Sequence, residues 1–160
     1  MIKLVLPLFF LALSTGCSTT TVKYDDASWH YEGDFPSTLS TKAGGTHIAM
    51  FLAWALLSEH GSELHYREYS EYFSDLKNRS VTPGQYLDQY CDGKLLSEDL
   101  NKKANTFTAA YYESGQYYED YERVLGKDLP TLYHADDSWQ NFEKIGSMLD
   151  LRYAQWNKEN

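Results

Sequence analysis

Cysteine is scarce in this chain of 160 residues, which contains only Cys17 and Cys91. Two cysteines cannot build the framework of several disulfides that stabilises many small exported domains. The fold must therefore be held by an apolar core, and a hydrophobic content of 42% is enough to form one. We expect Cys91 to be a buried, unreactive thiol on the apolar side of a helix. A Cys17–Cys91 disulfide is the alternative if Cys17 carries no lipid.

Recognisable catalytic and metal-binding motifs are also lacking. The chain has no glycine-rich phosphate loop, no GxSxG turn, no HExxH pair, no paired-cysteine zinc pattern and no EF-hand loop. We therefore expect no enzymatic activity and no bound cofactor. A metal site built from residues far apart in the sequence is the alternative, and its candidate ligands are His30, His47 and His134 with Asp34 or Asp136.

Basic residues are few, since 14 Lys and Arg face 23 Asp and Glu and give a net charge of −9. This balance argues against nucleic-acid binding, because that affinity comes largely from Lys and Arg side chains that neutralise phosphates. The same charge fits a solvated acidic surface or a protein partner with a basic face. The composition therefore argues against a nucleic-acid ligand, and of the two remaining interpretations it favours the solvated surface over the protein partner.

The first 17 residues have the features of an export signal: Lys3, an apolar stretch over residues 4–13, and then Ser-Thr-Gly-Cys. The ending on Gly-Cys resembles the bacterial lipobox, in which Cys17 becomes the lipidated first residue of the mature chain. We expect a cell-envelope protein anchored to the membrane through Cys17. The resemblance implies the outer membrane, facing the periplasm, because Ser18 and not Asp follows the cysteine. An ordinary cleaved signal, which would give a soluble periplasmic or secreted protein, is the alternative.

The segment from Ala43 to Leu57 (AGGTHIAMFLAWALL) is apolar on almost every side of a helix. Such a helix belongs inside a bundle, because no face of it suits water. Its apolar run from Ile48 to Leu57 is ten residues long, whereas a membrane span needs about 20. We therefore predict a core helix in which His47 is the polar side chain enclosed by apolar surface.

The rest of the pattern predicts one all-α domain over residues 24–160, with about six helices around the central one. A polar tether over 18–23 precedes it. Residues 24–40 lack a sustained period but are rich in aromatics, so we expect an ordered loop, with at most a short extended piece. No alternating strand pattern occurs. Further helices are predicted at about 66–78, 83–91, 98–114, 117–125 and 138–156.

Two helix starts carry specific signals. Thr82-Pro83-Gly84-Gln85 has the residues of a capping box with Pro at the first helical position, and Asp92-Gly93 is a turn pair that ends this helix. Ser97 is the predicted N-cap of the next helix, because Glu98 and Asp99 would be favoured in its first turn.

Polar residues embedded in aromatic loops are the candidate binding residues. We expect their loops to converge at one end of the bundle and to contact a ligand or a protein partner. The structural alternative for His47 is a core histidine hydrogen-bonded to a carboxylate or carbonyl group, and for the aromatics it is packing. The candidates are Trp29, His30, Asp34, His47, Asp92, Lys94, His134 and Asp136.

Six stretches resemble an uncharacterised bacterial domain family: YDDASWHYEGDFP, AGGTHIAMFLAWAL, TPGQYLDQYCDGKL, SEDLNKKANTF, AAYYESGQYYEDY and LPTLYHADDSWQNF. They follow this order over most of residues 24–142. Small domains of this kind are similar to immunity proteins, which bind and block a cognate toxin. The resemblance therefore implies a protein-binding function, and the export signal implies a toxin that acts in the periplasm or envelope. A ligand-binding or enzymatic domain that uses the His and Asp loops, and a purely structural lipoprotein, are the alternatives.

Overall fold

The central helix α1 (Thr46–Leu57) is enclosed on every side in the computed structural model, which describes residues 20–160. Every residue from Thr46 to Leu56 is buried, which confirms the predicted core helix. A 3-10 turn, η2 (Thr41–Gly45), precedes it, so the regular helix begins after the Gly-Gly pair. Across residues 20–160, no helix has both the length and the apolar character required to cross a bilayer. The export signal and Cys17 lie outside the described residues.

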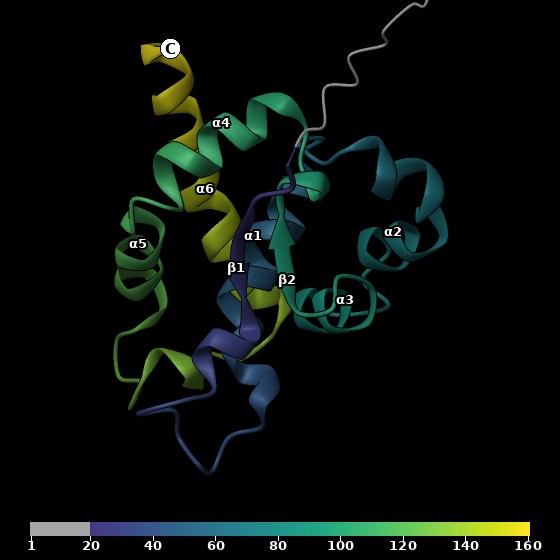
Figure 1. Ribbon diagram of the computed structural model, residues 1–160. Coiled ribbons are helices and arrows are strands. Elements are labelled where there is room, and N and C mark those ends of the chain that lie inside the picture. Colours follow the sequence, from purple (N-terminus) through teal and green to yellow (C-terminus); the bar gives the residue numbers. More distant parts are fainter. Residues whose placement is uncertain (1–19) are drawn as a thin grey trace, which may run out of the picture.

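Five more α-helices of the described chain surround α1: α2 (Ser70–Lys77), α3 (Pro83–Tyr90), α4 (Lys102–Tyr111), α5 (Gln116–Leu125) and α6 (Trp139–Glu159). Short turns connect them: η3 (Leu64–Glu68, a π-helix), η4 (Ser97–Asp99) and η5 (Leu132–His134). Figure 1 shows α1 in the middle, with α2 and α3 on one side and α4, α5 and α6 on the other. Both α3 and α6 pack directly against α1. The prediction of an all-α domain with about six helices is confirmed.

A small antiparallel sheet covers part of α1, and the sequence pattern did not reveal it. Strand β1 (Lys23–Asp26) pairs with β2 (Lys94–Leu96), and Leu95 is fully buried beneath the sheet. Strands of four and three residues are too short to display a period of two, which is the physical reason for the missed prediction. The backbone of Val22 also forms hydrogen bonds with Ser97. The ordered domain therefore includes Val22, which lies within the range 18–23 that we predicted to be a tether.

The helix ends follow the local capping chemistry. The capping box at α3 is confirmed: Gln85 N–H donates to the Thr82 hydroxyl, and Thr82 N–H donates to the Gln85 side chain. The helix ends at the expected turn, where Asp92 and Gly93 both have positive φ. The N-cap predicted at Ser97 is wrong. Leu100 is extended, and α4 begins after it, with Asn101 accepting a hydrogen bond from Ala104 N–H at 2.9 Å.

Asp120 joins three helices through one buried carboxylate. Its oxygens accept hydrogen bonds from Tyr111 Oη of α4 at 2.7 Å and from Arg152 Nε and Nη2 of α6 at 2.6 and 2.9 Å, and Arg123 also contacts it. Burial alone would raise the pKa of Asp120, but the Arg152 and Tyr111 donors hold the pKa below its ordinary value. The ionised form therefore links α4, α5 and α6.

Replacing Asp120 with Ala should lower the free energy of unfolding by about 2–3 kcal/mol, because Tyr111 and Arg152 lose their shared acceptor. The contribution of Asp120 is present above the ordinary aspartate pKa of about 4 and is lost as pH falls through the lowered pKa of the folded state. Urea unfolding at pH 7 and pH 3 measures both effects. The matched control is Glu119→Ala, an exposed carboxylate on the same helix, which should change stability little. Equal losses for the two variants would contradict this role.

Candidate functional site

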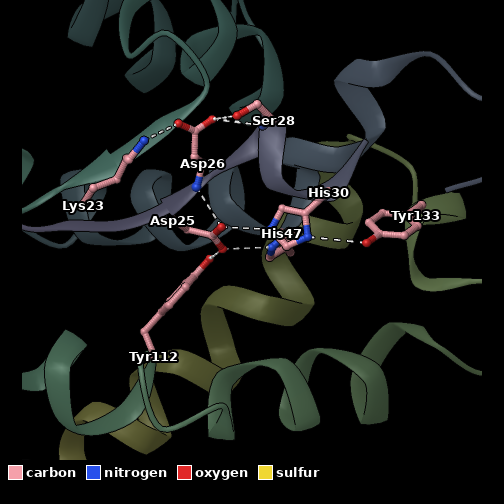
Figure 2. A network of polar contacts seen from close by, with 8 residues as sticks. All are labelled: Lys23, Asp25, Asp26, Ser28, His30, His47, Tyr112 and Tyr133. Atoms are coloured by element: carbon pink, nitrogen blue, oxygen red, sulfur yellow. Dashed lines mark hydrogen bonds and ion pairs between the residues drawn. The ribbon is translucent and has the colours of Figure 1, made fainter. Parts of the chain in front are cut away.

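The side chain of Asp25 is at the centre of a buried polar cluster (Figure 2). His30 Nε2 lies 2.9 Å from Oδ1, and His47 Nε2 lies 3.2 Å from Oδ2. Tyr112 Oη donates to Oδ2 at 2.7 Å, and the backbone N–H of Asp26 donates to Oδ1 at 2.8 Å. Each carboxylate oxygen therefore has two contacts, which is the full capacity of an ionised carboxylate.

Local structure explains why these residues meet. Strand β1 places Asp25 over α1, and the chain then turns sharply into the 3-10 helix η1 (Ala27–His30). Asp26 caps this turn by accepting a hydrogen bond from Ser28 N–H at 3.0 Å. The turn brings His30 back toward Asp25, while His47 comes from the first turn of α1. The two imidazole rings meet edge to face, with centroids 4.6 Å apart.

Burial and charge define the protonation states of the cluster. Burial alone would raise the pKa of Asp25, but hydrogen bonds from His30, His47 and Tyr112 hold the pKa well below its ordinary range. Burial lowers the pKa of His47, which outweighs the opposing effect of Asp25. Asp25 is therefore ionised and His47 is neutral at pH 7. Since an ionised carboxylate only accepts, each Nε2 that contacts it carries the ring proton.

Aromatic side chains enclose the cluster. Tyr133 Oη lies 3.4 Å from His30 Nδ1, and the Tyr118 ring packs edge-on against His47 with centroids 5.2 Å apart. Tyr117 Oη donates to the backbone oxygen of His47 at 2.7 Å. Burial raises the pKa of Tyr112 well above its usual value, so its hydroxyl remains a donor. Most of the cluster is thus shielded from bulk water. The exception is the side chain of His30, which is 19% exposed and reaches the surface.

The structure brings together only some of the residues that the sequence singled out. His30 and His47 meet at Asp25, and Trp29 lies beside them on η1 with its ring exposed. Asp34 is exposed and forms no hydrogen bond or ion pair with any side chain of residues 20–160, so it does not join the cluster. Asp92 and Lys94 pair with each other at the turn before β2, apart from the cluster.

His134 and Asp136 line a separate groove of about 420 Å³ between η2, α3 and η5. Lys42, Asp88 and Asp137 also line this groove. The side chain of His134 is held by Thr131 Oγ1, 2.9 Å from Nδ1. The expected convergence of all the loops in one site therefore does not occur. Two neighbouring regions are found instead, and Tyr133 belongs to both, since it contacts His30 and lines the groove. A ligand role for these residues stays a prediction.

A second histidine cluster escaped the sequence reasoning. His65 is fully buried, with Nδ1 2.8 Å from Tyr86 Oη and Nε2 3.0 Å from Asp99 Oδ1. Cys91 lies within the same group, and burial raises the pKa of its thiol well above the ordinary value. The raised pKa agrees with the expected unreactive thiol, but Cys91 is half-buried at the C-terminal end of α3 rather than fully buried. No spacing signal in the sequence joins His65 to Asp99, because the contact depends on how η3 packs against η4.

His47 should remain neutral down to a pH below the ordinary histidine value of about 6.5. Unfolding releases this histidine to its ordinary pKa, so the free energy of unfolding should fall as pH drops below about 6.5. Ring NMR of His47 gives the midpoint, and urea unfolding from pH 8 to pH 5 gives the slope. His47→Gln should reduce that slope. A His47 midpoint at or above 6.5 would contradict a neutral, buried imidazole.

Comparison with known proteins places the chain in a family. A family profile described as a domain of unknown function, DUF7832, matches residues 23–135. This range includes Asp25, His30 and His47 and excludes α6. No curated protein and no solved structure matches the chain. Because the profile covers most of the 160 residues, the resemblance to an uncharacterised domain family is confirmed, and the chain belongs to the DUF7832 family.

Proposed function

We propose that this chain is a protein-binding module of the cell envelope, tethered through Cys17, whose partner is a protein with a basic face. An immunity role, in which the partner is a toxin acting in the periplasm or envelope, is the form of this function that the sequence resemblance implies. The proposal assigns no catalytic step to the domain. The observation that carries it is the exposure of Trp29 on the surface of an otherwise well-packed fold.

Exposed aromatic rings gather on one segment, residues 29–35, which we call the aromatic segment. Trp29 is 56% exposed and Tyr31 is 38% exposed, and Lys23 Nζ lies 4.9 Å from the centre of the Trp29 ring. Tyr31 packs edge to face with Phe35, which holds it in place. Trp and Tyr are the residues most enriched among the anchors of protein interfaces, since they bury a large area with few rotatable bonds. The segment therefore has the composition of an interface anchor.

The charge around the aromatic segment supports a basic partner. Residues 27–41 contain Glu32 and Asp34, both exposed, and no Lys or Arg. Burial raises the pKa of the Tyr31 hydroxyl, and the nearby carboxylates of Asp88 on α3 and Asp92 in the following turn raise it further. Lys42 and Asp88 continue this surface into the groove lined by His134 and Asp136. An acidic rim around apolar anchors favours encounter with a positively charged protein.

Removing the Trp29 anchor should weaken partner binding by about 2 kcal/mol, or about 30-fold in Kd. The full chain with a C-terminal tag would be used to capture proteins from native envelope extract, followed by mass spectrometry. We expect one stoichiometric protein that Trp29→Ala loses and Leu151→Ala retains, since Leu151 is a 67% exposed apolar side chain on α6. Equal capture by both variants would exclude the aromatic segment as the interface. Absence of any stoichiometric protein would count against the protein-binding function itself.

Reversing the charges on the aromatic segment should slow association. The double variant Glu32→Lys/Asp34→Lys should lower the association rate constant for the captured partner about tenfold at low salt and flatten its salt dependence. The control is Glu68→Lys/Glu71→Lys, an exposed acidic pair near α2 with the same change in net charge. Stopped-flow or surface plasmon resonance measures both rates. An association rate constant equal to that of the control variant would show that the charges of this segment do not steer association.

A further inference from the structure

We propose that Asp25, His30 and His47 form a binding site for one divalent transition-metal ion, with Zn²⁺ as the ion that the donor set fits. This inference does not depend on the partner-binding function, because it concerns the inner side of η1 and is tested by direct metal binding. The donor set consists of two imidazoles and one carboxylate. That combination provides three protein ligands to catalytic zinc sites and leaves further coordination positions open.

The spacing of the donor atoms fits a single ion. One ligand atom from each of the three side chains lies within 4.8 Å of the other two. Two atoms that bind one tetrahedral zinc at about 2.0–2.1 Å are about 3.3 Å from each other. The observed separations are 2.9 Å between Asp25 Oδ1 and His30 Nε2, and 3.2 Å between Asp25 Oδ2 and His47 Nε2. Figure 2 shows both imidazoles on the same side of the Asp25 carboxylate, so one ion in front of the carboxylate could contact all three side chains.

The charge of the cluster also favours binding of a cation. Asp25 is ionised, His47 is neutral, and no Lys or Arg of residues 20–160 forms an ion pair with Asp25. Lys23 pairs with the neighbouring Asp26 instead, at 2.8 Å. A divalent ion in front of this buried carboxylate would add a favourable charge interaction to its hydrogen bonds.

Hydrogen bonds from neighbouring groups hold the proposed metal ligands in position. Tyr112 Oη and Asp26 N–H donate to the oxygens of Asp25, and these bonds remain when the carboxylate binds metal. When Nε2 of a neutral His30 binds metal, its ring proton resides on Nδ1. Tyr133 Oη, 3.4 Å away, then accepts from that N–H group. The ring proton of His47 must likewise move from Nε2 to Nδ1, so each proton stays within its own ring and the total charge of the site changes only by that of the ion. Tyr112 stays protonated, since burial raises its pKa, and acts as a donor to Asp25.

The second histidine cluster is the natural competitor for metal, and its chemistry is less suitable. The His65 side chain is fully buried, whereas the His30 side chain is 19% exposed. The sulfur ligand of the second cluster would be Cys91, whose raised pKa keeps the thiol protonated, whereas metals bind the thiolate. The Asp25 cluster requires no such deprotonation, and the partly exposed side chain of His30 gives an ion a route from solvent.

The test is metal titration of the purified full chain after treatment with a chelator. Isothermal titration with Zn²⁺ should give one site per chain, and Zn²⁺ should raise Tm. His30→Gln should abolish this site, whereas His134→Gln, a histidine in the neighbouring groove, should retain it. Tyr112→Phe should keep one site and weaken it about 10- to 100-fold, as expected of a positioning residue. Absence of a stoichiometric site in the wild-type chain, or equal binding by His30→Gln, would overturn the proposal.

Two measurements on the wild-type chain do not depend on whether a variant folds. Addition of Zn²⁺ should shift the ring NMR signals of His30 and His47 and leave those of His65 and His134 in place. Co²⁺ should give a visible spectrum without a thiolate-to-cobalt charge-transfer band. Shifts confined to His65, or such a thiolate band, would assign the metal to the Cys91 cluster and overturn the proposal. These metal-binding results do not depend on partner binding, so the outcome of the capture experiment with Trp29→Ala does not affect them.

Discussion

The complete burial of α1 is the constraint on which the other elements of this fold depend. A helix that is apolar on every side must be covered on every side, and the small sheet and five α-helices of the described chain do this. The polar side chains of Thr46 and His47 are enclosed with it. The buried Nε2–H of His47 needs a hydrogen-bond acceptor, and β1 supplies Asp25 at 3.2 Å. A sheet of two short strands is therefore essential to the core, since it brings the carboxylate to the buried helix.

The two buried histidine clusters follow the same logic. Near β1, Asp25 satisfies His30, His47 and Tyr112, and near α3 a carboxylate and a phenol satisfy His65. The two clusters differ in access, because His65 is sealed while the side chain of His30 is partly exposed. They also differ in the third group, a Cys91 thiol in one and a second imidazole in the other. These differences in access and donor chemistry make the Asp25 cluster the one of the two with functional potential.

The parts of the fold that were predicted correctly are those with strong local signals. The all-round apolar pattern of α1 and the capping box at Thr82 depend on neighbouring residues, and both are present in the structure. The strands and the start of α4 were missed, because they depend on pairing and on the extended Leu100 rather than on a period. Within the candidate site, His30 and His47 were identified correctly as neighbours, but Asp34 was paired with them instead of Asp25. Asp34 lies nearer to His30 in the sequence, whereas only the turn from β1 into η1 reveals that Asp25 faces both histidines.

The turn η1 presents adjacent residues to opposite environments: Trp29 faces solvent, and His30 faces the buried carboxylate. An ion held inside and a protein held outside would therefore act on the same four-residue turn. Thermodynamic reciprocity then applies to the two events, so that any gain in partner affinity on ion binding would equal the gain in ion affinity on partner binding. The availability of the metal would in this way set how firmly the domain holds its partner.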